Sequence, residues 1–363
     1  MARVLHLITS DHRRGAETFA VELAEHLRRA GHDVRVMAVA RSGSHDPLPV
    51  EHAGRSRTDP AALRRIVGAA RWSDVVVSFG SSSVLPAAAA ARLTRRPFVY
   101  RNIGDPTVWG AVKAGNLRVG APLRTAQVVV ALYQEAAAAL VGSYRLDPAR
   151  VRVIPRGVPQ DAFEPADAAA RRRSCDVLGL DPARRWMAYV GALSAEKDPM
   201  LAVETLGHLP EDVGLVIAGD GPLGDEVRTR ATRFGDRCRL LGTVRDVAGV
   251  YAASSALILP SHTEGIPGAV IEAGLAARPT VAFPVGGVPG VVLDGITGRL
   301  VGDRTPSAVA AAIAEVLERP DELGRAAREH CLAGFSMTRV GAAWEQMITD
   351  VTADGPAPGP RRP

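Results

Sequence analysis

Cysteine is scarce in this 363-residue chain, and so are the features of a secreted or membrane-spanning protein. The three cysteines, Cys175, Cys238 and Cys331, lie far apart and form no C-x-x-C pair, which argues against a disulfide framework and a cysteine-based zinc site. The N-terminal stretch MARVLHLIT lacks the long apolar region and cleavage site of a signal peptide, and no apolar run reaches membrane-spanning length. We therefore expect a cytoplasmic protein with structural thiols.

Aromatic residues and lysines are also few. Aromatic residues make up 4% of the chain, and only two of its 44 basic residues are lysines, Lys113 and Lys197. Residues 1–160 carry 23 Lys and Arg against 12 Asp and Glu, whereas residues 161–363 carry 21 against 27. The basic half predicts attraction to anionic lipid headgroups or phosphorylated substrates. No nucleic acid partner is expected, because aromatic interleaving and recognition-helix patterns are missing. A solvated arginine-rich surface is the alternative.

What the chain does have is an alternation of short apolar runs and amphipathic stretches. Nearly continuous apolar runs are typical of strands buried on both faces of a parallel sheet. They are RVLHLIT, DVRVMAVA, DVVVSF, PFVYRN, AQVVVAL and VRVIP in the first half, then RWMAYVGAL, VGLVIAG, CRLLG, SALILP and PTVAF. The length also exceeds that of one hydrophobic core. We predict an α/β protein of two doubly wound, Rossmann-like domains that face each other across a cleft.

Proline and glycine mark the predicted domain limits. The segment RGVPQDAFEPADAAARRR, which contains Pro159 and Pro165, is predicted to be an irregular hinge. The N-terminal domain would span residues 1–160 and the second domain residues 161–336. Residues 353–363 are rich in proline and glycine and are predicted to be disordered.

Two strand ends carry residues suited to a phosphate group. Gly15 and Ala16 come just before a predicted helix, where small residues let an anion reach free backbone N–H groups. Lys197 follows a strand and opens a helix near Pro199, and a compact ammonium there could reach a diphosphate. An ordinary glycine turn and a chance surface lysine are the alternatives.

The segment GDGPLG, residues 219–224, matches the dinucleotide-binding pattern G-x-G-x-x-G. Arg245, beyond the next strand, could hold a 2′-phosphate, so an NADP-dependent oxidoreductase is one candidate. However, the segment does not follow the first strand of either sheet, and the next strand does not end in an acidic residue for a ribose. A tight strand-to-helix turn is the favoured interpretation.

Two carboxylates bracket a glycine- and proline-rich helix start in TEGIPGAVIEA. Pro267 suits the first position of a helix, and Gly265 and Gly268 leave backbone amides accessible to an anion. Glu264 precedes this start and Glu272 lies within the helix. Because carboxylates accept hydrogen bonds from hydroxyl groups, the pair predicts a nucleotide-sugar site, with one glutamate for the sugar and one for the ribose. Two solvated helix charges are the alternative.

These segments resemble the retaining glycosyltransferases of family 4, which have the GT-B fold of two Rossmann-like domains. The resemblance covers nearly the whole chain, and its motifs follow the family's order: RGAETFAVELAEHLRRAGHDV, VRVIPRGV, VGALSAEKD, LVIAGDGPL, LLGTVRDVAGVYAASSALILPS, TEGIPGAVIEA and VGGVPGVVLDGITGRLV. By this resemblance GDGPLG is a family turn and not a cofactor loop.

The resemblance implies a role for each candidate residue. Lys197 would contact the donor diphosphate, Glu264 the transferred sugar and Glu272 the ribose, while backbone near Thr243–Arg245 would hold the base. The last helix, about residues 337–352, would pack back on the first domain, which binds the acceptor in this family. The catalytic pair would be Lys197 and Glu264, within the donor-binding set Gly15, Ala16, Lys197, Arg245, Glu264, Gly265, Ile266, Pro267, Gly268 and Glu272.

The chain also departs from the family pattern. The departures are Arg14 in place of a glycine, Arg156 in place of an asparagine, Ala192 in place of an arginine and Gly290 in place of a glutamate, and Asn102 and Ile103 occupy a region where a histidine is common. Without that histidine, the candidates for the acceptor side are Arg101, Asn102 and Asp105.

The expected activity is transfer of a sugar from UDP or GDP to an acceptor hydroxyl with retention, as in the hexosyltransferases of class EC 2.4. The sequence contains no Asp-x-Asp, which favours an enzyme without a metal or other cofactor. The acceptor is expected to be anionic or lipid-linked, and the basic first domain is compatible with peripheral contact at the inner face of a membrane. A sugar-nucleotide epimerase, the NADP-dependent oxidoreductase and a non-catalytic binding protein are the alternatives.

Overall fold

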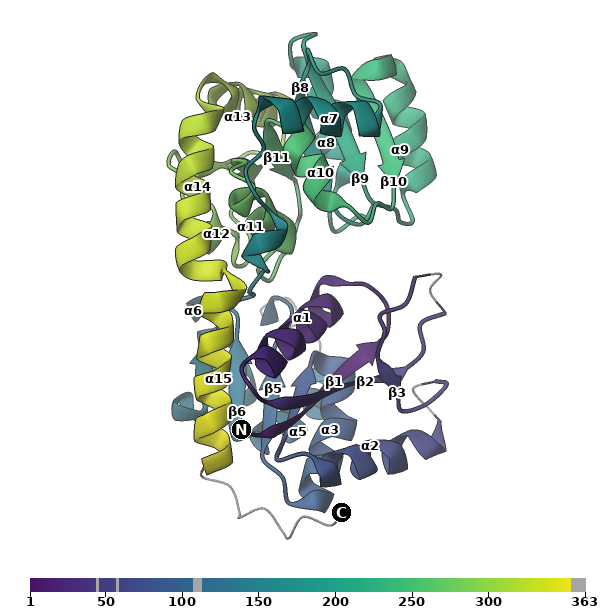
Figure 1. Cartoon of the computed structure of the whole chain (residues 1–363), viewed down its shortest axis with the longest axis vertical. Coiled ribbons are helices and arrows are strands. Elements are labelled where there is room, and N and C mark those ends of the chain that lie inside the picture. The colour runs from purple at the N-terminus through teal and green to yellow at the C-terminus, as the bar shows by residue number, and fades with distance from the viewer. Residues whose placement is uncertain (44–45, 57–58, 107–112, 354–363) are drawn as a thin grey trace. The chain divides into compact units, whose positions relative to one another are not determined.

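The computed structural model describes residues 1–43, 46–56, 59–106 and 113–353 (Figure 1). The chain forms two compact units, each built around its own parallel sheet. The first unit contains Met1–Gly157 and the segment from Met337 onward, and the second contains Val158–Ser336. The chain thus enters the second unit slightly before the predicted limit at residue 160. Of the tail predicted to be disordered, residue 353 ends the last helix and the remainder lies outside the described residues.

The first sheet has seven parallel strands in the order β3-β2-β1-β4-β5-β6-β7. Six of them coincide with predicted apolar runs, whereas β3 was not predicted because its two residues show no apolar pattern. The strand order reverses between β1 and β4, where a ligand site is expected in such a sheet. The strands are β1 (Arg3–Ser10), β2 (Asp33–Ala40), β3 (Glu51–His52), β4 (Val75–Phe79), β5 (Phe98–Arg101), β6 (Val128–Ala131) and β7 (Val151–Val153).

Helices cover both faces of the first sheet, as in a doubly wound fold. On one face, Phe19 of α1 and Trp344 of α15 join the buried side of the strands. Trp344 is fully buried and stacks on Phe79 of β4 with ring centroids 6.0 Å apart. The C-terminal helix α15 therefore belongs to the first unit. The helices are α1 (Gly15–Arg29) and α15 (Met337–Ala353) on this face, and α2 (Pro60–Trp72), α3 (Ser81–Thr94), α5 (Lys113–Arg124) and α6 (Gln134–Tyr144) on the other.

The second sheet has six parallel strands in the order β10-β9-β8-β11-β12-β13. Its order reverses between β8 and β11, so this sheet repeats the arrangement of the first and confirms the predicted fold class. The strands are β8 (Arg185–Val190), β9 (Val213–Ala218), β10 (Cys238–Gly242), β11 (Ala256–Leu259), β12 (Thr280–Ala282) and β13 (Gly298–Leu300).

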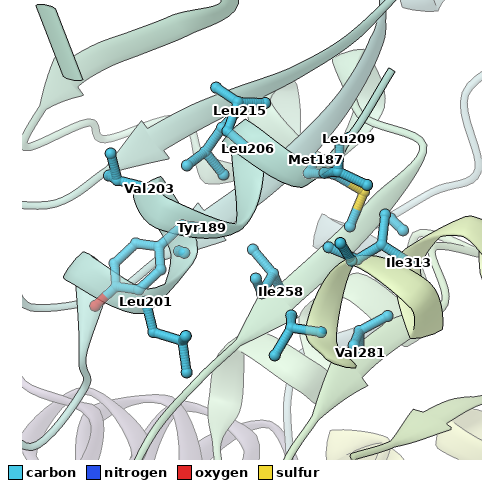
Figure 2. Packing of buried hydrophobic residues seen from close by; sticks show 14 of the residues in the cluster. Met187, Tyr189, Leu201, Val203, Leu206, Leu209, Leu215, Ile258, Val281 and Ile313 are labelled. Atoms are coloured by element: carbon cyan, nitrogen blue, oxygen red, sulfur yellow. The ribbon is translucent and has the colours of Figure 1, made fainter. Parts of the chain in front are cut away.

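The core of the second unit lies between this sheet and its helices (Figure 2). Met187, Tyr189 and Ile258 from the strands pack with Leu201 of α8 and Ile313 of α13, and together they hold the strand ends rigidly. The helices are α7 (Ala168–Leu178), α8 (Pro199–Thr205), α9 (Gly224–Ala231), α10 (Val247–Ala253), α11 (Gly268–Leu275), α12 (Val288–Val291), α13 (Pro306–Glu318) and α14 (Pro320–Phe335). Short 3-10 helices occur at Pro148–Arg150, Gln160–Ala162, Leu206–His208 and Thr232–Arg237.

Helix α7 begins inside the segment that was predicted to be irregular. The side chain of Asp167 accepts a hydrogen bond from the backbone N–H of Ala170 and caps the helix. Pro165 comes before this cap, so it does not interrupt the helix. The prediction of a long irregular hinge was therefore wrong from residue 168 onward. No helix in the described part of the chain has the length and apolar character that a membrane span requires.

Candidate functional site

The ends of β8 and β11 bring Lys197 and Glu264 into contact. These strands are neighbours, so the loops that follow them meet at one edge of the sheet. The Nζ atom of Lys197 lies 2.7 Å from Oε1 of Glu264 and 3.8 Å from the carboxylate of Glu196. The hydroxyl of Ser261 donates a hydrogen bond of 2.7 Å to the same oxygen of Glu264. The Glu264 side chain is only 7% exposed, so one ammonium and one hydroxyl hold a buried carboxylate.

Direct pairing of the two residues was not predicted, because the sequence analysis gave them separate parts of one ligand. The side chain of Lys197 is 25% exposed, so the ammonium is reached by solvent while it contacts Glu264. Each charge partly offsets the cost of burying the other. The arrangement can present an ammonium to a phosphate and a carboxylate to hydroxyl groups from adjacent positions.

Glu272 is held by a tyrosine. The hydroxyl of Tyr251 lies 3.1 Å from Oε2 of Glu272 and 3.1 Å from the carbonyl oxygen of Ala269. Tyr251 is fully buried on α10, whereas Glu272 on α11 is half-buried. The rigid phenol therefore helps to orient a carboxylate that is still accessible to a ligand.

The helix start between the two glutamates lies one residue later than predicted. Pro267 is the N-cap of α11, and Gly268 is the first helical residue. Within the described residues no side chain caps this end, so the first N–H groups of the helix can meet an anion. The carbonyl oxygen of Gly265 accepts a hydrogen bond of 2.7 Å from the N–H of Gly287, and Ile266 is buried, so the loop is anchored on both sides.

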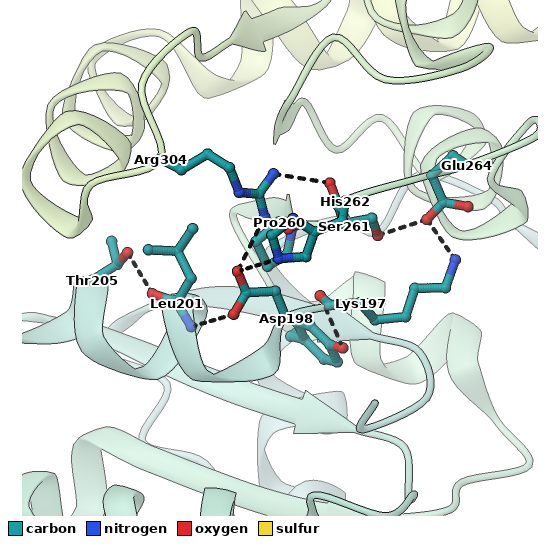
Figure 3. A network of polar contacts seen from close by, with 10 residues as sticks. Lys197, Asp198, Leu201, Thr205, Pro260, Ser261, His262, Glu264 and Arg304 are labelled. Atoms are coloured by element: carbon teal, nitrogen blue, oxygen red, sulfur yellow. Dashed lines mark hydrogen bonds and ion pairs between the residues drawn. The ribbon is translucent and has the colours of Figure 1, made fainter. Parts of the chain in front are cut away.

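A second group of charged residues connects the same two loops (Figure 3). This group was not predicted from the sequence. Arg304 donates hydrogen bonds to Oδ2 of Asp198 and to the carbonyl oxygen of Ser261, both at 3.1 Å, and to the carbonyl oxygen of Pro260. The Nε2 atom of His262 lies 3.2 Å from the same Oδ2 of Asp198. Arg304 therefore fastens the loop before α8 to the loop after β11.

Asp198 also caps α8 from an unusual backbone conformation. Its Oδ1 accepts a hydrogen bond of 3.2 Å from the N–H of Leu201, and its φ of 48° lies in the left-handed region that aspartate tolerates better than most residues. The Asp-Pro pair at 198–199 is a helix-start signal that the sequence does contain. Arg304 has no local signal, since it lies 43 positions from Ser261 and 106 from Asp198.

The GDGPLG segment is a packing turn. The φ of Gly219 is 151°, and a Cβ atom there would lie 1.8 Å from the carbonyl oxygen of Gly191. A Cβ atom at Gly221 would lie 2.5 Å from the carbonyl oxygen of Leu193. These two glycines are needed because the turn after β9 presses against the loop after β8. The segment also follows β9, away from the β8–β11 reversal where a dinucleotide would be expected.

In the first unit, Gly15 and Ala16 are the first two residues of helix α1, whereas they were predicted to come just before it. The N-cap residue, Arg14, makes no side-chain capping hydrogen bond within the described residues. The Nη1 atom of Arg156 lies 2.6 Å from the position that a Cβ atom of residue 15 would occupy. The glycine therefore leaves room for a guanidinium group at the start of the helix.

The residues expected on the acceptor side follow β5 in the same unit. Arg101 and Asn102 are buried, at 2% and 7% exposure, and Asp105 is partly exposed. Burial and then the carboxylate of Asp105 raise the pKa of Tyr133. Burial, followed by the charge of Arg156, lowers the pKa of Arg101 to about 9, so its guanidinium remains protonated at neutral pH.

The remaining predicted contact residue, Arg245, lies exposed in the loop between β10 and α10 of the second unit. The predicted site residues thus divide into a set on the second unit around Lys197, Glu264 and Glu272, and a set on the first unit around Gly15. Among the described residues, no group of three or more histidine, cysteine or acidic side chains is placed to hold a metal ion.

Two family models match this chain. The model described as Glycosyltransferase Family 4 matches residues 13–162, and the model described as Glycosyl transferases group 1 matches residues 184–319. One relative is a "D-inositol 3-phosphate glycosyltransferase" of Mycolicibacterium gilvum, 38% identical over 208 residues, which are 54% of this chain and 46% of the relative. The protein of the same name from Mycolicibacterium smegmatis is 32% identical over 238 residues, 61% of this chain and 54% of the relative. The chain therefore matches about half the length of these relatives.

Solved structures are similar over almost the whole chain. HepE of Anabaena, crystallised with UDP and glucose, superposes with a TM-score of 0.85 at 20% identity, covering 96% of this chain and 100% of that one. Sucrose-phosphate synthase from Thermosynechococcus elongatus superposes with a TM-score of 0.81 at 20% identity, covering 97% and 99%. At this identity the likeness establishes the fold alone. With a glycosyltransferase model matching each of its two parallel-sheet units, the chain belongs to glycosyltransferase family 4 and has the GT-B fold.

Proposed function

We propose that this protein transfers a sugar from a nucleoside diphosphate, UDP or GDP, to an acceptor hydroxyl with retention of configuration and without a metal ion. The observation that carries the proposal is the contact between Lys197 and Glu264 at the β8–β11 edge, where the loop with Glu264 leads into helix α11 with Glu272. The complexes of HepE with UDP and with UDP-glucose support a nucleotide-sugar donor.

In the proposed reaction, the bond between the anomeric carbon and the diphosphate oxygen breaks, and negative charge builds on the departing phosphate. Lys197 would stabilise this charge, and losing such a contact typically costs on the order of 3 kcal/mol, roughly a hundredfold in rate. Glu264 would accept hydrogen bonds from the sugar, and Glu272 from the ribose diol. The acceptor oxygen bonds the anomeric carbon on the same face, and its proton passes to the departing phosphate, so no protein base is required.

The proposed acceptor is a phosphorylated or lipid-linked alcohol. The name D-inositol 3-phosphate glycosyltransferase, carried by the relatives, supports a phosphorylated acceptor. The excess of basic residues in residues 1–160 favours the same chemistry and also peripheral contact with an anionic membrane. Added salt should then weaken capture of the acceptor or of anionic vesicles.

A thermal-shift screen of UDP, GDP, ADP and their sugar conjugates tests the donor assignment. The cognate diphosphate should raise the melting temperature, and incubation with phosphorylated alcohols should give a product whose anomeric configuration, read by NMR, matches the donor. Lys197→Ala and Glu272→Ala should each weaken nucleotide binding, and unchanged affinity in both would contradict the site. Donor consumption without an acceptor would indicate an epimerase, an NADP difference spectrum an oxidoreductase, and binding without turnover a non-catalytic protein.

A further inference from the structure

Arg101 is a buried cation at the carboxyl end of β5. The residue is 2% exposed, and its Nε has no hydrogen-bond partner among the residues that the structure describes. Its Cζ atom lies 4.1 Å from the ring centroid of Phe19 on α1 and 5.9 Å from that of Phe79 on β4. Aromatic faces attract a cation but do not satisfy its N–H groups in the way an oxygen does. A buried guanidinium in this setting is costly unless another group accepts its hydrogen bonds.

Arg156 brings a second guanidinium group to the same place. It reaches from the loop after β7 to the start of α1, where its Nη1 occupies space that any side chain larger than glycine at residue 15 would fill. Phe19, whose ring is in contact with the guanidinium group of Arg101, lies one turn further along the same helix. The two guanidinium groups are close enough for Arg156 to lower the pKa of Arg101, second only to burial.

Helix α1 contributes its own charges at this position. The acidic residue in its first turn is Glu17, which is 7% exposed. The positive end of the dipole of this 15-residue helix lies at the same helix start. Burial and then Arg156 lower the pKa of Arg101, and among the described residues the group that raises it is Tyr100 rather than a carboxylate.

We propose that Arg101, Arg156 and the first backbone N–H groups of α1 form a binding site for a phosphoryl group. Guanidinium groups pair with phosphate oxygens through parallel hydrogen bonds, and a phosphate would accept the hydrogen bond for which Nε of Arg101 has no partner among the described residues. Arg14 does not cap the helix with its side chain, so the helix N–H groups are available to the same anion. The arginine at position 156 is this chain's own, since the family often has an asparagine there.

The identity of the phosphoryl group rests on the proposed function. It is either the diphosphate of the donor or the phosphate of the acceptor. In the first case the site would stabilise the negative charge of the diphosphate. In the second case it would select phosphorylated acceptors.

Calorimetric titration of the full-length protein with inorganic pyrophosphate, UDP and uridine tests the site. Arg156→Gln should weaken binding of pyrophosphate by about tenfold or more, because a charge-assisted contact is lost, and should leave uridine unaffected. The pyrophosphate affinity of Arg156→Lys should lie between those of the parent protein and Arg156→Gln, since lysine keeps the charge but loses the planar guanidinium group. The matched control is Arg92→Gln, which removes an exposed arginine from α3 of the same unit and should stay within about twofold of the parent protein.

The variant Arg101→Met distinguishes a role of Arg101 in phosphate binding from a role in folding stability. Methionine fills similar space without a buried charge, so the unliganded variant should melt at the same temperature as the parent protein or higher, while its pyrophosphate affinity falls at least as far as that of Arg156→Gln. A lower melting temperature with unchanged affinity would mean that Arg101 is purely structural, and would overturn the proposal.

Comparison of the probes distinguishes a donor diphosphate from an acceptor phosphate. It also tests the phosphoryl site separately from the proposed sugar transfer. Weaker UDP binding in Arg156→Gln assigns the site to the donor. Unchanged UDP binding with weaker pyrophosphate binding and a higher KM for a phosphorylated acceptor assigns it to the acceptor. Equal affinities of parent and variants for every probe overturn the site, even where sugar transfer is observed. Conversely, arginine-dependent pyrophosphate binding without any sugar transfer supports the site and contradicts the proposed function.

Discussion

The ammonium nitrogen of Lys197 lies 2.7 Å from Oε1 of Glu264, although 67 positions separate the two residues in the chain. They meet because β8 and β11 are neighbours at the point where the strand order reverses. The ion pair links a residue proposed to bind the leaving diphosphate with one proposed to bind the sugar. Changes to either residue should therefore affect both stability and turnover, and the two effects can be separated.

Lys197→Met should lower kcat by roughly a hundredfold, because the charge on the departing phosphate loses its ammonium. It should also lower the free energy of unfolding by about 1–3 kcal/mol, since among the described residues the buried carboxylate of Glu264 keeps only the hydroxyl of Ser261 as a hydrogen-bond donor. The double variant Lys197→Met, Glu264→Gln should regain most of the stability and none of the activity. Urea unfolding and initial rates measure the two effects, and recovery of turnover in the double variant would exclude a direct role for Lys197.

Tyr251→Phe should raise the donor KM about fivefold with little change in kcat, because Glu272 loses one orienting hydrogen bond worth about 1 kcal/mol. The effect would reach the donor through the carboxylate, since the phenol is buried on α10. The control is Tyr144→Phe, the same chemical change on α6 of the first unit. A donor KM equal in the two variants would show that Tyr251 does not position Glu272.

The strands were predictable where burial alone determines the pattern. β4, β6 and β11 are almost wholly apolar because helices cover both faces of their sheets. β3 and β13 were missed, since each is a short edge strand with charged residues in its pattern.

The site was predictable at the level of single residues and not of contacts. Lys197, Glu264 and Glu272 stand in motifs with a local signature. The pairing of Lys197 with Glu264 depends on which strands are neighbours, and that information is spread over the whole unit. Arg304 was missed for the same reason, because its partners lie in two distant loops.

Arg304→Lys should reduce both kcat, by about tenfold, and the free energy of unfolding, by about 1–2 kcal/mol. Lysine cannot donate to Asp198 and to two loop carbonyl groups at once, and it would lose the planar contact with the ring of Phe283, 4.1 Å away. The control is Arg299→Lys, whose ion pairs with Asp294 and Glu315 lie at the surface and should change stability by no more than about 0.5 kcal/mol. Equal effects of the two substitutions would show that Arg304 does not fasten the loops.

Gly221→Ala should destabilise the second unit by several kcal/mol, on the order of 3 or more, because its Cβ atom would lie 2.5 Å from the carbonyl oxygen of Leu193. Gly224→Ala, in the same motif, meets the side chains of Asp220 at 3.2 Å and Leu193 at 3.9 Å, and no backbone atom is among these neighbours, so it should be tolerated. A dinucleotide-binding loop would instead lose NADP binding in both variants. Thermal unfolding with and without NADP distinguishes these outcomes, and a melting temperature raised by NADP in the parent protein would contradict the packing role.

Acidification should destabilise the first unit through His6. Its imidazole is fully buried on β1, with Nδ1 2.9 Å from the carbonyl oxygen of Ala20, and burial is the main cause that lowers its pKa from 6.5 to about 4. Between these values the unfolded chain binds a proton that the folded chain does not. The contribution of neutral His6 to the free energy of unfolding is therefore fully present above pH 6.5. It is lost as the pH falls toward 4, at up to about 1.4 kcal/mol per pH unit.

His6→Leu should remove this dependence. Between pH 7.5 and pH 5.0, the parent protein should lose about 2 kcal/mol more unfolding free energy than the variant, from urea unfolding at each pH. His208→Asn, which changes an exposed histidine of the second unit, should behave like the parent protein. Leucine keeps the apolar packing against Phe79, whose ring centroid lies 4.9 Å from that of His6, so the comparison isolates the proton from the core contact. Equal losses of unfolding free energy in the parent protein and in His6→Leu would show that another group controls stability at acidic pH.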